Sequence, residues 1–307
     1  MIILKSTQIT HGKVILIGEH SVVFGYHALA LPTPSIQIKT VLTDIKAVTC
    51  TLVTNDYTGE LSRAPKNFAG IIWTVQAIRQ RYSIKSAFEL RFEGEIPEER
   101  GLGSSAAVAL GTIKVMQEHF NLHLTKAEII ELANAAETIN HGSASGLDVA
   151  TVNSNHLVSF SKQSGPTEIR AKLGGFLVIA DSGELGNTKE AVQLVSSELR
   201  QNPSKNNLMA RLDTLATQAL TSFEEHDAHS FGKKMTEANE ILASFGLTTN
   251  RLDELINRAI NNGALGSKIS GGGLGGIVIS LAETRASAQA IQHAQAELSA
   301  NIWIEEI

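Results

Sequence analysis

The sequence is poor in cysteine, proline and basic residues, and each shortage excludes a class of protein. Cys50 is the only cysteine, so the chain can form no internal disulfide and no cysteine-based metal site. Six prolines in 307 residues exclude collagen-like and proline-rich disordered chains. No apolar run approaches the roughly 18 residues of a membrane helix, and the apolar start after Met1 is too short for a signal peptide. We therefore expect a cytoplasmic protein without a membrane partner.

The charge balance argues against a nucleic-acid partner. Acidic residues outnumber basic ones, 31 to 26, and the formal net charge is −5. Phosphate backbones attract basic surfaces, so this balance disfavours a protein that clamps DNA or RNA. A small anionic ligand stays compatible with the sequence, because it needs only one local pocket.

The length and the apolar pattern predict a two-domain mixed protein. At roughly 100–200 residues per domain, 307 residues suit about two domains, and 43% hydrophobic residues suit a large buried core. The pattern changes from strand-rich to helix-rich after Asp181, and we expect domains at 1–170 and 171–307. Strands are expected at 13–17, 22–31, 36–42, 48–52, 88–92, 149–160, 175–180, 277–281 and 301–306. Helices are expected at 70–81, from the segment after Gly103 to about 120, and at 125–138, 188–200, 205–226, 229–244, 249–262 and 284–299.

Two glycine-rich segments point to phosphate binding. Gly101–Ala106 (GLGSSA) opens a helix of small residues, where backbone N–H groups and the helix dipole favour an anion. The string also fits the dinucleotide pattern G-x-G-x-x-A, but a second helix follows where a Rossmann unit needs a strand. Five of the six residues at 271–276 are glycine, which costs too much chain entropy for a plain linker. A packing turn and a flexible connector are the structural alternatives.

Two further segments carry charged residues that suit group transfer. Lys13 begins a strand that leads to Gly18-Glu19-His20, and Glu137 and Asp148 lie at the ends of a helix-to-strand segment. Carboxylates at such positions serve as a magnesium ligand or as a catalytic base. Each residue taken singly has a plain structural reading, as a solvated charge, a turn or a helix cap.

The ordered set of these segments resembles the GHMP kinase superfamily, which includes galactokinases, homoserine kinases, mevalonate kinases and phosphomevalonate kinases. The matching segments are KVILIGEHSVVFG (13–25), GLGSSAA (101–107), HGSASGLD (141–148) and KISGGGLGG (268–276). Together with DSGELGNTKEAV (181–192), they are most similar to the mevalonate kinases within that superfamily. The resemblance implies an α+β fold of two domains with the active site in the cleft between them. It implies a sheet-rich N-terminal domain with a phosphate loop and a left-handed βαβ crossover, and a ferredoxin-like C-terminal domain.

The resemblance also implies a reaction and roles for individual residues. ATP and Mg²⁺ are the expected cofactors, and the primary hydroxyl of mevalonate is the expected acceptor, giving 5-phosphomevalonate. Asp148 would accept the hydroxyl proton, Lys13 would stabilise the transferring charge, and Ser105 with Glu137 would bind magnesium. The expected substrate contacts are Glu19, His20 and Thr188. The expected nucleotide contacts are Glu98, Glu99, Arg100, Gly101, Leu102, Gly103, Ser104, Ser105, Ala106, Gly271, Gly272 and Gly273.

The sequence departs from the family pattern at several positions, and several alternative functions stand beside mevalonate phosphorylation. His11 stands where the family usually has proline, Ala144 replaces another proline, and Glu98-Glu99-Arg100 precedes the phosphate loop where small residues are common. These departures affect loop geometry more than reaction type.

The alternative functions are those of a phosphomevalonate kinase or another superfamily kinase, of a catalytically silent sensor that binds ATP or a sugar, and of a nicotinamide-dependent oxidoreductase. A homodimer is left open by the sequence.

Overall fold

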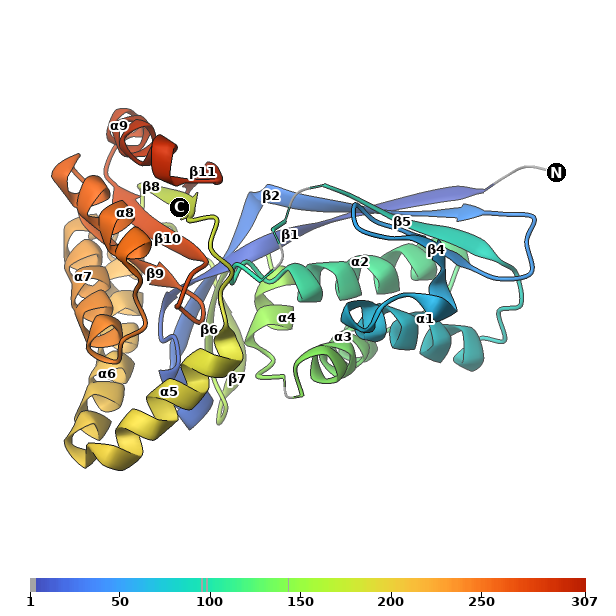
Figure 1. Cartoon of the computed structure of the whole chain (residues 1–307), viewed down its shortest axis with the longest axis horizontal. Helices are drawn as coiled ribbons and strands as arrows, with labels where there is room; N and C mark the ends of the chain where they lie inside the picture. The colour runs from blue at the N-terminus through green and yellow to red at the C-terminus, as the bar shows by residue number, and fades with distance from the viewer. Residues whose placement is uncertain (1–3, 95, 98, 143) are drawn as a thin grey trace. The chain divides into compact units, whose positions relative to one another are not determined.

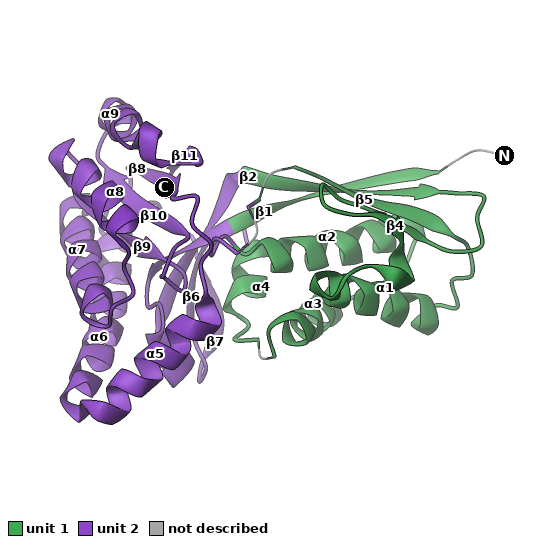
Figure 2. Cartoon of the chain, in the orientation of Figure 1, with its two compact units in different colours: residues 1–12, 36–96, 103–153 green, residues 13–35, 97–102, 154–307 purple. Residues whose placement is uncertain are grey.

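The computed structural model describes residues 4–94, 96–97, 99–142 and 144–307 (Figure 1). The chain divides into two compact units (Figure 2): unit 1 comprises residues 1–12, 36–96 and 103–153, and unit 2 comprises residues 13–35, 97–102 and 154–307. The units are discontinuous because strands β1 (Lys5–Ile17) and β2 (Ala28–Asp44) each contribute residues to both. This division differs from a single boundary at residue 170, and the 1–170 and 171–307 domains stay a prediction.

Unit 1 is a sheet with helices packed against it. Its strands lie in the order β4-β3-β5-β2, and β2 pairs antiparallel with β5 from Ile38 opposite Gly94 to Asp44 opposite Phe88. The alternation that predicted a strand at 88–92 is confirmed, since Phe88, Leu90 and Phe92 are buried. The elements are β3 (Thr51–Val53), β4 (Thr58–Glu60), η2 (Leu61–Arg63), η3 (Lys66–Phe68), α1 (Ala69–Arg81), β5 (Phe88–Gly94), α2 (Ser104–His119), α3 (Lys126–His141) and α4 (Leu147–Val152).

Helix α2 is the buried central helix of unit 1, and its small residues explain why. A Cβ on Gly111 would lie 2.3 Å from Thr40 Oγ1 of β2, so only glycine permits this approach of helix to sheet. Thr10 Oγ1 of β1 donates a hydrogen bond of 2.9 Å to the Ala107 carbonyl oxygen. These contacts fix the N-terminal half of α2 against β1 and β2 within the unit.

Helix α3 begins with a capping box, and the sequence pattern that predicts it is a threonine (Thr125) followed three residues later by a glutamate (Glu128). The Glu128 amide donates to Thr125 Oγ1 (3.3 Å), and the Thr125 amide donates to Glu128 Oε2 (2.7 Å). The backbone and side-chain hydrogen bonds from Thr125, followed by that from Arg81, lower the pKa of Glu128 to about 2. The stabilisation from this carboxylate is therefore present above the unfolded-state pKa of a glutamate and is lost as the pH falls towards 2.

Thr125→Ala is expected to lower the free energy of unfolding by about 1 kcal/mol, because it removes the acceptor for the Glu128 amide. Urea denaturation measures the change. The matched control is Thr214→Ala, an exposed threonine inside α6 (Asn206–Glu224), where alanine has the higher helix propensity. Equal destabilisation by both variants would show that the cap contributes nothing.

Unit 2 contains a four-stranded antiparallel sheet in the order β11-β8-β10-β9. If the four strands of this sheet are numbered along the chain, their spatial order is 4-1-3-2. Helices connect the first strand (β8) to the second (β9) and the third (β10) to the fourth (β11), as in a ferredoxin-like fold. The elements of the unit are η1 (Ser21–Phe24), β6 (Leu157–Ser161), β7 (Gly165–Ile169), β8 (Phe176–Asp181), α5 (Thr188–Gln201), η4 (Pro203–Lys205), α6, α7 (Ala228–Ser244), α8 (Asn250–Asn261), β9 (Gly266–Ser270), β10 (Ile277–Ala282), α9 (Arg285–Gln295), η5 (Ala296–Leu298) and β11 (Asn301–Glu306). The ferredoxin-like expectation is confirmed.

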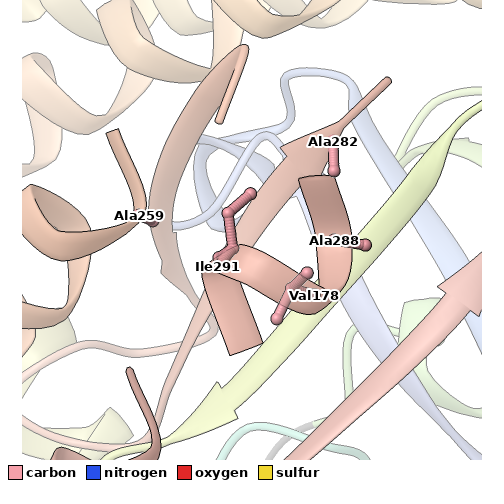
Figure 3. Packing of buried hydrophobic residues seen from close by; sticks show 5 residues of the cluster. All are labelled: Val178, Ala259, Ala282, Ala288 and Ile291. Carbon is pink, nitrogen blue, oxygen red and sulfur yellow. The ribbon is translucent and has the colours of Figure 1, made fainter. Parts of the chain in front are cut away.

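Helices α8 and α9 pack on this sheet through small and branched apolar residues (Figure 3). Val178 of β8 and Ala282 of β10 meet Ala259 of α8 and Ala288 and Ile291 of α9, and all five are fully buried. Removing such side chains from water is the main stabilising contribution of this interface. Within the described ranges, none of the helices combines the length and apolarity needed to cross a membrane.

Two expected strands are wrong in part. Residues 22–31 were expected as one strand, but Ser21–Phe24 forms a 3₁₀ helix and β2 begins only at Ala28, because His20 and Gly25 take positive φ values of 60° and 97°. Residues 149–160 were expected as a strand, but 147–152 form α4, and β6 starts at Leu157. Short apolar runs do not distinguish a buried helix from a strand, and here packing decides. The sequence also missed β4, β7 and β9.

Candidate active site

The predicted site residues fall into two sets, one in each unit. The unit 2 set contains Lys13, Glu19, His20, Thr188 and the residues of two loops, 99–102 and 271–276. The unit 1 set contains Gly103–Ala106, Glu137 and Asp148. Glu98 lies outside the described residues. The string Gly101–Ala106 passes from unit 2 to unit 1 after Leu102.

A strained, buried turn carries Glu19 and His20. Gly18 has φ 110°, and a Cβ there would lie 2.5 Å from the Ala28 Cα atom. His20 has φ 60°, which is uncommon for a residue other than glycine. Both side chains are buried, with Glu19 1% and His20 6% exposed. Buried charge and backbone strain at one turn are more typical of a functional site than of an ordinary surface loop.

Glu19 forms a fully buried ion pair with Lys268, a residue to which the sequence analysis assigned no role. Lys268 Nζ donates to Glu19 Oε1 and, at 2.6 Å, to the Ile269 carbonyl oxygen. Burial raises the pKa of the Glu19 carboxyl, and the Lys268 ammonium opposes that shift. Burial likewise lowers the pKa of Lys268, and Glu19 opposes it. The only sequence signal for this contact was a lysine next to the glycine loop.

His20 is bound to the glycine loop. Its Nε2 lies 2.8 Å from the Gly272 carbonyl oxygen, and since a carbonyl only accepts, Nε2 carries the proton and donates. Burial lowers the pKa of His20, which favours the neutral imidazole. Nδ1 is then an acceptor, and in the described residues no hydrogen-bond partner reaches it.

The two glycine-rich loops of unit 2 touch through their backbones. A Cβ on Gly271 would lie 3.1 Å from the Gly101 Cα atom, and one on Gly101 would lie 3.0 Å from the Ser270 carbonyl oxygen. A Cβ on Gly272 would lie 2.8 Å from both the Cα and the Oγ1 atoms of Thr188. Close packing of the backbone therefore brings Gly271 beside Gly101 and Gly272 beside Thr188, while the nucleotide and substrate contacts expected of these residues stay predictions.

Lys13 and Arg100 hold the loop that precedes α2. The Lys13 amide donates to the Leu102 carbonyl oxygen and Lys13 Nζ donates to the Gly101 carbonyl oxygen, both at 2.9 Å. Arg100 Nε lies 3.0 Å from Asp181 Oδ1, and its Nη2 donates to the Gly183 carbonyl oxygen. The Glu99 carbonyl oxygen accepts from the Gly186 amide at 2.8 Å. Arg100 thus has a structural role in unit 2, and nucleotide contacts by Glu99 and Arg100 stay predictions.

In unit 1, Ser105 and Glu137 come together at the N-terminus of α2. Gly103 takes φ 73° as the N-cap, and no side chain caps this helix in the described part of the chain, which leaves its first N–H groups for a ligand. Ser105 Oγ donates to Glu137 Oε2 at 3.0 Å and lies 3.2 Å from His141 Nε2. A hydroxyl and a carboxylate are oxygen ligands of the kind that magnesium prefers, so this pair fits the predicted metal role.

Asp148 lies in the first turn of α4, whose N-cap Gly146 takes φ 87°. The side chain is partly exposed. His141, by contrast, received no role from the sequence, although its ring contacts Ser105 Oγ and lies 3.9 Å from Glu137 Oε2. Its place four residues after Glu137 on α3 is the signal that could have found it, because residues four apart share a helix face.

Comparisons with known proteins identify the family of this chain. The GHMP kinases N terminal domain matches residues 69–155, and the GHMP kinases C terminal domain matches residues 219–298. The mevalonate kinase of Methanothermobacter thermautotrophicus is 30% identical over 280 residues, which are 90% of this chain and 90% of that protein.

Two solved structures share the fold. That of L. major mevalonate kinase in complex with R-mevalonate has a TM-score of 0.85 at 22% identity, covering 97% of this chain and 94% of that one. That of Streptococcus pneumoniae phosphomevalonate kinase, in complex with phosphomevalonate and AMPPNP, has a TM-score of 0.79 at 19% identity and covers both chains fully. The structural matches give the fold, and the sequence match over nine-tenths of both chains gives the family. This chain belongs to the GHMP kinase family.

Proposed function

We propose that the chain catalyses the ATP-dependent phosphorylation of the primary hydroxyl of (R)-mevalonate, giving 5-phosphomevalonate. The observation that carries this proposal is the similarity to a mevalonate kinase along 90% of both chains. The buried turn with Glu19 and His20 supports it, because that turn offers polar atoms suited to a small hydroxylated substrate. Fold alone would not distinguish the acceptor, since a phosphomevalonate kinase shares it.

The proposed roles follow from the chemistry of phosphoryl transfer. The transition state is loose, so the protein mainly positions the reactants and neutralises charge. Asp148 accepts the proton of the attacking hydroxyl, and Lys13 stabilises negative charge on the transferring group. The free N–H groups at the start of α2 hold nucleotide phosphates, and the loop 271–273 lets its backbone approach them.

Magnesium is the second cofactor in this proposal. When bound, Mg²⁺ would neutralise phosphate charge. Ser105 Oγ and Glu137 Oε2 are the protein oxygens that would hold it. Glu137 is 6% exposed, and burial keeps such a carboxylate in one place for the metal.

An ADP-release assay with mevalonate, phosphomevalonate, homoserine and galactose as acceptors tests the function. We expect turnover with mevalonate and a kcat/KM for each other alcohol at least about 100-fold lower, because a site built for one substrate's polar groups leaves them unpaired with another. Preferred turnover of phosphomevalonate would replace the proposal by its nearest rival. ATP binding without turnover of any alcohol would indicate a sensor.

Glu137→Gln is expected to raise the magnesium concentration for half-maximal activity by roughly tenfold or more, and to slow turnover. The amide keeps the shape of the side chain and removes the charge that a divalent cation needs. Activity measured across a magnesium titration at saturating ATP gives the result. Glu131→Gln, an exposed residue of the same helix, is the matched control and should leave the curve unchanged. An unaltered magnesium requirement in Glu137→Gln would make Glu137 a structural residue.

A further inference from the structure

A buried arginine joins the loop before α2 to the sheet of unit 2. Arg100 Nε lies 3.0 Å from Asp181 Oδ1, and the two side chains are only 14% and 2% exposed. Arg100 Nη2 also donates to the Gly183 carbonyl oxygen at 2.9 Å. Breaking a buried ion pair leaves one charge without compensation, so the folded protein keeps these two side chains together.

Asp181 is a rigid anchor for this arginine. It is the last residue of β8, and it lies opposite Ile277 of β10 on one side and opposite Asn301 of β11 on the other. Its Oδ1 atom also accepts a hydrogen bond of 2.9 Å from the Gly183 amide. The sheet therefore fixes the carboxylate, and the carboxylate fixes the side chain of Arg100.

The loop around Arg100 has a backbone conformation that needs such an anchor. Glu99 has φ 55° and Gly101 has φ 84°, so both neighbours of Arg100 lie in the left-handed region. A glutamate is disfavoured there, and a disfavoured conformation persists only where surrounding contacts hold it. The Arg100 contacts and the hydrogen bond from the Gly186 amide to the Glu99 carbonyl oxygen supply that support.

The same loop conformation determines the position of an acceptor for Lys13. Lys13 is buried, and its Nζ atom donates to the Gly101 carbonyl oxygen at 2.9 Å. That carbonyl belongs to the residue directly after Arg100. A change in the backbone at Arg100 therefore moves the Gly101 carbonyl and alters where the Lys13 ammonium lies.

We propose that Arg100 is a positioning residue for phosphoryl transfer, which acts through the Gly101 carbonyl to hold Lys13 Nζ in place. The inference rests on the proposed function, in which Lys13 stabilises charge on the transferring group. It gives a role to an arginine at a position where the family commonly has a small residue. Arg100 itself touches no reactant in this proposal, in contrast to the nucleotide contact that the sequence predicts.

Steady-state kinetics of Arg100→Met with ATP and mevalonate both varied tests the inference. Methionine keeps much of the length of the side chain and removes its charge. We expect kcat to fall about 10- to 100-fold, because small misplacements of a catalytic group have effects of this size. Both KM values should change little, because stabilisation that acts only in the transition state appears in kcat.

Two further variants separate the role of Arg100 from a general loss of stability. Arg258→Met is the matched control, because Arg258 Nε lies 3.0 Å from Glu254 Oε1 and its Nη1 donates to the Ala294 carbonyl oxygen at 3.0 Å, yet no site role is assigned to it. It should keep the full kcat. Arg100→Lys should restore part of the lost kcat, since it keeps the positive charge facing Asp181 without the guanidinium geometry.

A double-mutant cycle tests whether Arg100 acts through Lys13. In a Lys13→Met background, Arg100→Met should lower the single-turnover rate much less than it does in the unmodified protein, because the group that it positions is gone. An undiminished effect in that background would overturn the inference. If Arg100→Met does not fold, Asp181→Asn replaces it in all of these measurements, because asparagine keeps the shape of the anchor and removes its charge.

The other outcomes point to the alternatives. A raised KM for ATP with an unchanged kcat would make Arg100 a nucleotide contact and overturn the inference. A lower melting temperature with an unchanged kcat would make it a structural residue, with the same consequence. Transfer to another alcohol in place of mevalonate would overturn only the proposed substrate, and the same kcat test then applies with that alcohol. ATP binding without transfer to any alcohol would overturn both proposals.

Discussion

Replacing Asp148 with asparagine is expected to lower kcat with mevalonate by at least about 100-fold, the usual scale for the loss of a general base. Asparagine keeps the size and planarity of the side chain and removes the group that accepts the hydroxyl proton. The KM for ATP should change little, because the nucleotide phosphates are assigned to α2 and to the loop 271–273. Steady-state kinetics with both substrates varied gives the two quantities separately.

The structural alternative for Asp148 is stabilisation of α4, since an acidic residue in the first turn interacts favourably with the helix dipole. Asp253→Asn is the matched control, because Asp253 is the acidic first-turn residue of α8 and lies outside the site. We expect Asp253→Asn to retain full activity with a similarly small change in melting temperature. Near-normal kcat in Asp148→Asn would refute its role as the base.

Gly18→Ala is expected to destabilise the protein by about 3 kcal/mol or more, by adding overpacking to backbone strain. The new Cβ would lie 2.5 Å from the Ala28 Cα atom and from the His27 carbonyl oxygen, and backbone cannot move aside as a flexible side chain can. The φ of 110° adds the cost that a side chain imposes in this region. Because Glu19 and His20 follow directly, mevalonate binding should weaken in the fraction that folds.

Gly25→Ala separates the two contributions to that loss. Gly25 has a similar φ of 97°, but a Cβ there meets no atom within 4 Å. It should therefore show the backbone strain alone, at about 1–2 kcal/mol. Chemical denaturation of both variants measures the difference. Equal destabilisation would show that close packing at Gly18 contributes nothing and that glycine is needed there only for its dihedral angle.

Local patterns predicted the fold well wherever one physical cause dominates. The alternation at Phe88, Leu90 and Phe92 placed β5, and Thr125 with Glu128 placed the start of α3, because a pleated strand and a capping box depend on neighbouring residues. The segments 22–31 and 149–160 failed for the opposite reason. Their apolar residues suit a buried strand or a buried helix equally, and contacts distant in sequence decide between them.

In the candidate site, too, some features depend on neighbouring residues and others depend on contacts distant in sequence. Its motifs could be predicted because the residue types alone indicate the chemistry. These residue types are the dense glycines, the small residues at a helix start and the paired carboxylates. Lys268 and His141 could not be assigned in that way. Lys268 is 249 residues from Glu19 along the chain, and no local pattern reports so distant a contact.

By itself, the sequence determined the class of protein, the segments proposed to bind phosphate and the residue types available for phosphoryl transfer. These properties depend on composition and on near neighbours in the chain, which the order of residues states directly. The tertiary structure alone decided that Glu19 is paired with Lys268, that His20 donates from Nε2 to Gly272, and that Gly272 must be glycine beside Thr188. Each of these depends on burial and on distances between remote segments, and folding creates both.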